Sequence, residues 1–333
     1  MNPINKIGLL EPENFEATIR PKYAPVVVRG AAADWPIVQA GGRSTDEALS
    51  LIERMGSRAQ TEVMLVPPEE KGRFFYRHDM RGFNFKKVKA TLGQVAAHLR
   101  LIAKQDKPIG IYAGATSLKS HVPGFIESHP IPLTPQDGSE ALIWLGNATQ
   151  IATHFDLSDN FAIVAHGTRR FTLFPPEATK HLYVGPLNET LAGQPVSMVD
   201  PVAPDRERYP EYGQAEELAL VATLHPGDLI YIPKLWWHHV QAVDPVNILV
   251  NHWHNDVSHG GGFLALVHSM LAIRELPQPE KEAWREWFDH FVFGPDAGNA
   301  ADHLPLHARG INGPSTPDRN RMIRDFLVRV LSR

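Results

Sequence analysis

The chain has 333 residues, of which 43% are hydrophobic and 21% charged, a balance typical of an ordinary soluble globular protein. Its formal charge of −4 excludes a strong overall attraction to nucleic acid or anionic membrane, although it leaves room for a local basic patch. The absence of cysteine excludes disulfides, thiolate metal sites and cysteine nucleophiles.

The sequence shows no pattern typical of a targeting signal. The first 30 residues lack the long apolar core of a signal peptide. No apolar run approaches the roughly 18 residues of a membrane span. We therefore expect a cytoplasmic protein with no membrane partner, built as one large domain with an appendage.

The first part of the chain mixes helical and strand patterns. After an irregular or helical lead, residues 25–30 predict a strand. Ser44 or Thr45 is the expected cap of one helix, and Thr91 of another. A loop is expected at 123–138, which is rich in proline and polar residues. The other elements predicted here are helices at 46–55 and 92–99 and strands at 62–66, 73–76 and 109–112.

From residue 141 onward, short strand patterns follow one another. They lie at 141–146, 150–156, 160–166, 169–174, 219–224, 228–233, 237–243 and 246–253, separated mostly by Gly, Pro, Asn or Asp. Roughly eight such strands predict a mainly β fold, a two-sheet jelly roll or barrel. The insert at 185–214 is expected to be functional, because long loops in compact domains are seldom idle.

The character changes again after residue 258. Residues 1–258 are expected to form the main domain, with N-terminal α/β elements and a jelly-roll core at about 109–255. Residues 259–333 are expected to form a helical appendage, with helices at 263–274, 280–291 and 319–331. An aromatic stripe, which begins at Trp284, runs along the middle helix and is expected to pack on the barrel or on a second copy of the chain.

A candidate metal site begins in the stretch 144–176. His154 and Asp156 are two residues apart in a predicted strand, so their side chains point to the same face. A lone His-x-Asp pattern is weak evidence for a metal. A second one, His254–Asp256, runs into a glycine-rich break and is expected to leave the sheet.

A third ligand is sought in residues 226–240. There a Pro-Gly-Asp turn leads into a strand, a proline corner and two tryptophans, followed by His238 and His239. A histidine at this place could complete a triad of two imidazoles and one carboxylate, which leaves open positions on iron(II). The alternative is that both are ordinary strand histidines.

These linked motifs resemble the cupin-like branch of the JmjC oxygenases. These are iron(II)- and 2-oxoglutarate-dependent enzymes, and they include the asparaginyl hydroxylase that inhibits hypoxia-inducible factor. The resemblance covers roughly residues 20–255 and implies a double-stranded β-helix. It is strongest at 154–160, 167–176, 226–228, 232–233, 236–239 and 251–253, with a further likeness at 25–30.

The resemblance implies a role for individual residues. His154, Asp156 and His238 would be the iron ligands, and His239 would point to the opposite face. Arg169 falls where related hydroxylases place a basic residue, often lysine, on the distal carboxylate of 2-oxoglutarate, which arginine can bind bidentately.

Further residues are implied to line the co-substrate pocket. Asn160, Asn251 and Tyr112 are implied there, with turn or core polar groups as the alternative. Arg169 has its own alternative, a surface charge beside Arg170, but strand alternation places the two arginines on opposite faces. Ile151 stands where some relatives have a threonine that binds 2-oxoglutarate, so that contact must be absent or replaced.

The implied activity is hydroxylation of a protein side chain or small molecule by Fe(II), 2-oxoglutarate and dioxygen, with decarboxylation of 2-oxoglutarate to succinate. The insert 185–214 and residues 74–76 are candidates for the substrate wall. A tRNA base is a less favoured substrate, and a homodimer through the C-terminal helices is expected. Two alternatives stay open: a metal cupin enzyme that does not use 2-oxoglutarate, and a non-catalytic cupin binding module.

Overall fold

The computed structural model describes residues 1–8, 12–131, 139–191, 193–254 and 261–332. By its internal contacts the chain divides into two compact units, Met1–Asn255 and Asp256–Arg333. Within the described residues, no helix is both long and apolar enough to cross a membrane. The expected cytoplasmic location stays a prediction.

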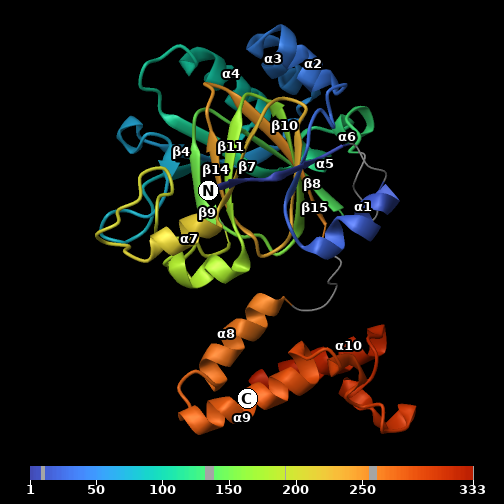
Figure 1. The fold of residues 1–333 in the computed structure, drawn as a ribbon. Helices are drawn as coiled ribbons and strands as arrows, with labels where there is room; N and C mark the ends of the chain where they lie inside the picture. Colours follow the sequence, from blue (N-terminus) through green and yellow to red (C-terminus); the bar gives the residue numbers. More distant parts are fainter. Residues whose placement is uncertain (9–11, 132–138, 192, 255–260, 333) are drawn as a thin grey trace. The chain divides into compact units, whose positions relative to one another are not determined.

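Two β-sheets form the centre of the first unit (Figure 1). The smaller sheet has the strand order β1-β12-β11-β14-β9-β5, and the larger has the order β2-β3-β13-β10-β15-β8-β7-β4-β6. The strands of the smaller sheet are β1 (Asn2–Pro3), β5 (Arg73–Phe74), β9 (Gln150–His154), β11 (Arg169–Phe174), β12 (Leu220–Leu224) and β14 (Trp237–Ala242). Those of the larger sheet are β2 (Asn5–Ile7), β3 (Val26–Val28), β4 (Gln60–Val66), β6 (Lys86–Thr91), β7 (Gly110–Ser117), β8 (Ser139–Gly146), β10 (Asp159–His166), β13 (Leu229–Ile232) and β15 (Asn247–His254).

Apolar side chains from both sheets meet in the space between them. Phe171 and Leu173 of β11 belong to the same buried cluster as Ala162 and Val164 of β10. Every residue of β10 is buried, because its other face packs on a second, larger core. Alternating side chains of the two sheets therefore build a double layer, which confirms the mainly β jelly roll expected for this part of the chain.

Helices cover the outer face of the larger sheet (Figure 1). The helices of this unit are α1 (Pro12–Thr18), α2 (Pro36–Arg43), α3 (Thr45–Met55), α4 (Leu92–Ile102), α5 (Leu118–His121), α6 (Phe125–Ser128) and α7 (Tyr212–Leu218). Ile52 of α3 and Leu99 of α4 are buried in one cluster with Ile163 of the sheet. Ser44 caps α3 by accepting a hydrogen bond from the Glu47 N–H, and Thr91 forms a capping box at α4.

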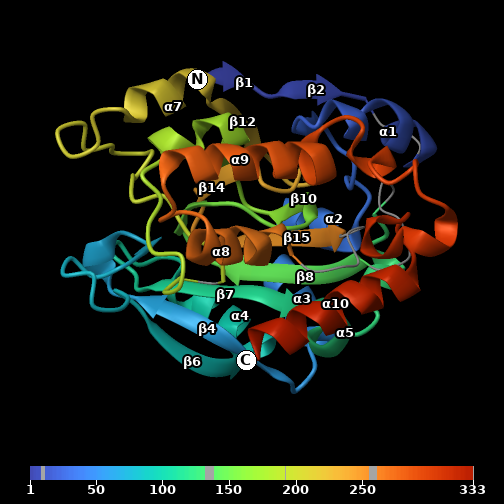
Figure 2. The same ribbon diagram turned by 90° about the horizontal axis from the view of Figure 1, so that it is seen from below.

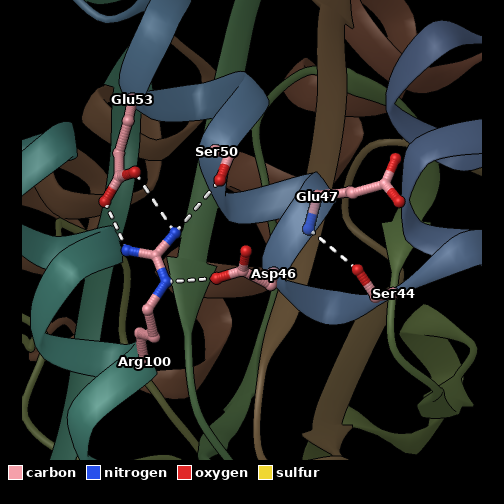
Figure 3. A network of polar contacts seen from close by, with 6 residues as sticks. All are labelled: Ser44, Asp46, Glu47, Ser50, Glu53 and Arg100. Carbon is pink, nitrogen blue, oxygen red and sulfur yellow. Dashed lines mark hydrogen bonds and ion pairs between the residues drawn. The ribbon is translucent and has the colours of Figure 1, made fainter.

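A polar cluster joins α3 to α4 at the surface (Figure 3). The Arg100 guanidinium donates to Asp46 at 2.5 Å and to both Glu53 oxygens at 2.7 and 3.2 Å. It also donates to the Ser50 hydroxyl at 3.3 Å. Because these acceptors share one face of α3, a single side chain of α4 fixes the spacing of the two helices above the sheet.

Several elements differ from the sequence predictions. The strand β6 was not predicted, because its mostly exposed lysine-rich sequence lacks the alternation of a half-buried strand. The helix α2 was also not predicted, and the predicted strand 73–76 shrinks to β5. Part of the predicted loop 123–138 forms the single-turn α6, and residues 132–138 lie outside the described residues.

The second unit is helical, as predicted. Its helices are α8 (Gly262–Ala272), α9 (Gln278–Phe288) and α10 (Pro317–Leu331). Among residues 261–332 only Ala301 and Asn320 are buried. The apolar faces of these helices therefore stay exposed within the unit itself.

Candidate metal centre and its pocket

Three predicted ligands converge in the first unit. His154 ends β9, Asp156 follows two residues later, and His238 lies on β14. One potential ligand atom from each residue lies within 4.8 Å of the others. His154 and His238 are direct partners in the β9–β14 ladder, with ring centroids 4.3 Å apart, and His238 Nε2 lies 3.5 Å from Asp156 Oδ2.

Backbone carbonyls orient both imidazoles. His154 Nδ1 lies 2.8 Å from the Ala152 carbonyl oxygen, and His238 Nδ1 lies 3.0 Å from that of Trp236. With the Nδ1–H donated to these oxygens, each ring keeps its Nε2 lone pair for a metal. Burial lowers the pKa of His238 to about 4, so this ring is neutral near pH 7 and able to bind a cation.

A chain of side-chain hydrogen bonds orients the Asp156 carboxylate. The Trp144 indole N–H donates to Asn251 Oδ1 at 2.7 Å, and Asn251 Nδ2 donates to Asn160 Oδ1 at 3.1 Å. Asn160 Nδ2 in turn donates to Asp156 Oδ2 at 3.1 Å. The two asparagines thus hold the Asp156 carboxylate as well as lining the pocket, and Trp144 is a member of this network that the sequence reasoning missed.

The turn before β14 is bonded to the loop that carries Asp156. The Leu235 N–H donates to the Asp156 carbonyl at 2.9 Å, and the Lys234 N–H donates to Asp159 Oδ1 at 3.0 Å. Leu235 has φ +66°, a left-handed conformation that is unusual for a branched side chain. A backbone conformation of this kind persists only where the surrounding structure fixes it. Here the turn holds His238 close to Asp156.

Arg169 lies in the same pocket and is only 2% exposed. It forms no ion pair with a carboxylate in the described part of the chain, and its Nε has no hydrogen-bond partner there. Burial lowers its pKa, whereas the Tyr112 hydroxyl beside it favours the charged form. Arg170 is exposed on the opposite face of β11, as alternation predicted.

One cavity of about 400 Å³ contains all of these groups. The seven predicted site residues that line it are His154, Asp156, His238, Arg169, Asn160, Asn251 and Tyr112. Phe74 and Leu191 also line it, from the two segments expected to form the substrate wall, and so does Ile151. In the second His-x-Asp pattern, His254 ends β15 and Asp256 lies outside the described residues.

The donor set fits the implied group. Two imidazoles and one carboxylate are the facial set that binds non-haem iron(II) and leaves positions free. The buried guanidinium in the same cavity is suited to an anionic ligand, because in the described part of the chain it lacks the carboxylate partner that a buried charge needs.

Comparison with known proteins gives a consistent result. Residues 12–260 match the model of the family described as cupin-like domain. The chain is 33% identical over 122 residues to HSPB1-associated protein 1 of Homo sapiens, which is 35% of this chain and 24% of that protein. It is 28% identical over 264 residues to the human bifunctional peptidase and (3S)-lysyl hydroxylase JMJD7, covering 69% of this chain and 77% of that protein.

A third relative is tRNA wybutosine-synthesizing protein 5 of Danio rerio, 32% identical over 136 residues, which is 40% of this chain and 37% of that protein. The match spans about a quarter of HSPB1-associated protein 1. The similarity to these proteins is therefore of unequal extent, and the JMJD7 match covers the most of this chain among the three.

Proposed function

The chain belongs to the cupin-like domain family, and on that premise we propose that it is an Fe(II)- and 2-oxoglutarate-dependent oxygenase. The reaction proposed is hydroxylation of a protein side chain or a small molecule. One observation carries this proposal: two imidazoles, a carboxylate and a buried guanidinium that has no carboxylate partner among the described residues line the same cavity. The name of JMJD7, a lysyl hydroxylase, supports the same class of reaction.

His154, Asp156 and His238 would hold the iron through two Nε2 atoms and one carboxylate oxygen. The bound metal, with 2-oxoglutarate and dioxygen, would supply the oxidising chemistry that converts a C–H bond to C–OH. Arg169 would bind the distal carboxylate of 2-oxoglutarate through charge-assisted hydrogen bonds, with Tyr112 beside it.

The rest of the pocket would orient groups and exclude water. The chain Trp144–Asn251–Asn160 holds the Asp156 carboxylate in one orientation, so a metal meets a preformed ligand. The aromatic rings around the cavity, such as Phe74, keep the reacting carbon away from bulk water. Among the described residues Arg169 has the Tyr112 hydroxyl beside it but no carboxylate partner, which favours this reading over a metal cupin that uses no anionic co-substrate.

Conversion of 2-oxoglutarate to succinate tests the proposal. We expect turnover in the iron-loaded protein, its abolition by His154→Ala and a raised KM for 2-oxoglutarate in Arg169→Ala. Arg170→Ala is the matched control, because it removes the neighbouring charge from the opposite face, and it should leave turnover unchanged. Tight iron binding without 2-oxoglutarate turnover over a broad substrate panel would refute the assignment.

A homodimer through the C-terminal helices is the second part of the proposal. The helices of residues 261–332 expose large apolar side chains, among them Leu264, Leu271, Trp287, Phe293 and Phe326. Pairing with a second copy would remove this surface from water. Sedimentation of the full chain should show a dimer that Trp287→Glu dissociates and Glu282→Lys does not. A monomeric wild-type chain would rule the dimer out.

A further inference from the structure

The larger sheet ends in an exposed strand. In the sheet order β6 is the last strand, and it pairs with β4 on one side only (Figure 2). No strand of the described residues occupies its other edge. Residues 86–89 are all exposed. Such an edge offers a row of unpaired N–H and C=O groups to another extended chain.

The register identifies which backbone groups are free. Thr91 lies opposite Gln60, but its N–H donates to the Gln94 side chain at 2.9 Å instead of to β4. In an antiparallel ladder, hydrogen-bonded and non-hydrogen-bonded pairs alternate. Lys89 and Lys87 are two and four residues before Thr91, so they too form non-hydrogen-bonded pairs with β4. Their backbone N–H and C=O groups therefore point to the free edge.

Lys87 lines the cavity, and Lys89 lies on the same face of the sheet. Lys89 is opposite Glu62 and Lys87 is opposite Met64, and residues directly opposite one another share a face of the sheet. Glu62, Met64 and Lys87 all line the cavity that holds the metal ligands. A strand added along β6 would thus run beside the mouth of the cavity.

The charge of this edge points to one kind of occupant. Between Lys86 and Thr91 the strand has three lysines and no acidic residue. One ion pair is formed, from Lys87 to Glu62 at 2.8 Å, and its side chains are 43% and 57% exposed, so it holds Lys87 weakly. Like charges oppose the pairing of β6 with a second β6. A polyphosphate would be attracted too, but it has no peptide groups to pair with those of the edge.

We propose that β6 is a docking edge for an acidic, extended polypeptide segment that adds a strand to the larger sheet. This inference rests on the proposed function in one respect: it takes the acidic segment to be part of the substrate protein. Acidic side chains of the added strand would meet Lys87 and Lys89, while its backbone bonds the outward groups. The docked segment would hold the substrate protein beside the cavity while another part of that protein enters the cavity.

Fluorescence anisotropy with a labelled peptide of alternating glutamate and valine, about six residues long, tests this edge. We expect Lys87→Glu combined with Lys89→Glu to weaken binding to the full chain about tenfold. The control combines Lys104→Glu with Lys107→Glu, which changes the net charge equally beyond the far end of α4, and it should bind as wild type does. Unchanged binding in the β6 double variant would overturn the proposal.

A second variant tests the backbone pairing itself. Lys89→Pro removes an N–H that points to the free edge and keeps the ladder to β4, so we expect weaker peptide binding with an unchanged melting temperature. If single-stranded oligouridine binds more tightly and displaces the peptide, the site is one for nucleic acid and the proposal fails.

Binding and turnover are separable. Peptide binding should persist in His154→Ala, which lacks a metal ligand. If the wild type binds the peptide but turns over no 2-oxoglutarate across the broad substrate panel, the docking edge stands and the oxygenase is refuted. If it turns over 2-oxoglutarate but does not bind the peptide, the oxygenase stands and the docking edge is refuted.

Discussion

Replacing Arg169 with methionine is expected to stabilise the ligand-free protein while removing its affinity for 2-oxoglutarate. The guanidinium is 2% exposed and has no carboxylate partner among the described residues, and burial lowers its pKa. An uncompensated buried charge costs several kcal/mol, and apolar replacements of buried charges often gain 1–4 kcal/mol. Loss of the contact with the Tyr112 hydroxyl offsets about 1 kcal/mol of that gain.

The net expectation is a free energy of unfolding that rises by roughly 1–2 kcal/mol in Arg169→Met. Addition of 2-oxoglutarate should reverse which of the two proteins is the more stable. At about 100 times its Kd, 2-oxoglutarate stabilises the wild type by about 2.7 kcal/mol, whereas the variant should gain nothing. The stability without ligand and the response to ligand therefore change in opposite directions.

Urea unfolding of metal-loaded protein under nitrogen, with and without 2-oxoglutarate, measures both quantities. Arg170→Met is the matched control, because Arg170 is the exposed neighbour on the same strand, and its effect should stay within about 0.5 kcal/mol. A ligand-free Arg169→Met protein that is less stable than wild type would refute the reasoning, since the guanidinium would then have a stabilising partner.

Three further outcomes follow from the structure. Burial lowers the pKa of His252 from 6.5 to about 4, so the wild type loses stability as the pH falls from 6.5 towards 4, because the unfolded chain takes up a proton that the folded protein does not. His252→Leu removes this loss. The unfolding free energy of the variant relative to the wild type should therefore be higher at pH 5 than at pH 7.5 by roughly 1–2 kcal/mol. A pH profile of urea midpoints that is the same in both proteins would contradict this. Arg100→Met should lower the unfolding free energy by about 1 kcal/mol, because the partly exposed clamp between α3 and α4 is lost; an unchanged urea midpoint would disprove that (Figure 3). In titration calorimetry with cobalt(II), His238→Asn should weaken metal binding at least about 100-fold and His239→Asn should not, and equal losses would argue against His238 as a ligand.

The local pattern of the sequence contains much of the site. The two-residue spacing of His154 and Asp156 predicts a shared face, and the structure brings both to one point although β9 ends at His154. Alternation also separates Arg169, which is buried, from Arg170, which is exposed. Such predictions succeed because strand geometry is set by adjacent residues, whatever lies across the sheet.

Tertiary structure decides which distant residues meet. The register that pairs His154 with His238, and the hydrogen bonds from Trp144 through Asn251 to Asn160, join strands far apart in the chain, so no local pattern contains them. The docking edge β6 escaped prediction for a related reason. Periodicity reports the face that a segment buries, and an exposed edge strand buries almost none, so its position beside the cavity follows only from the order of strands in the folded sheet.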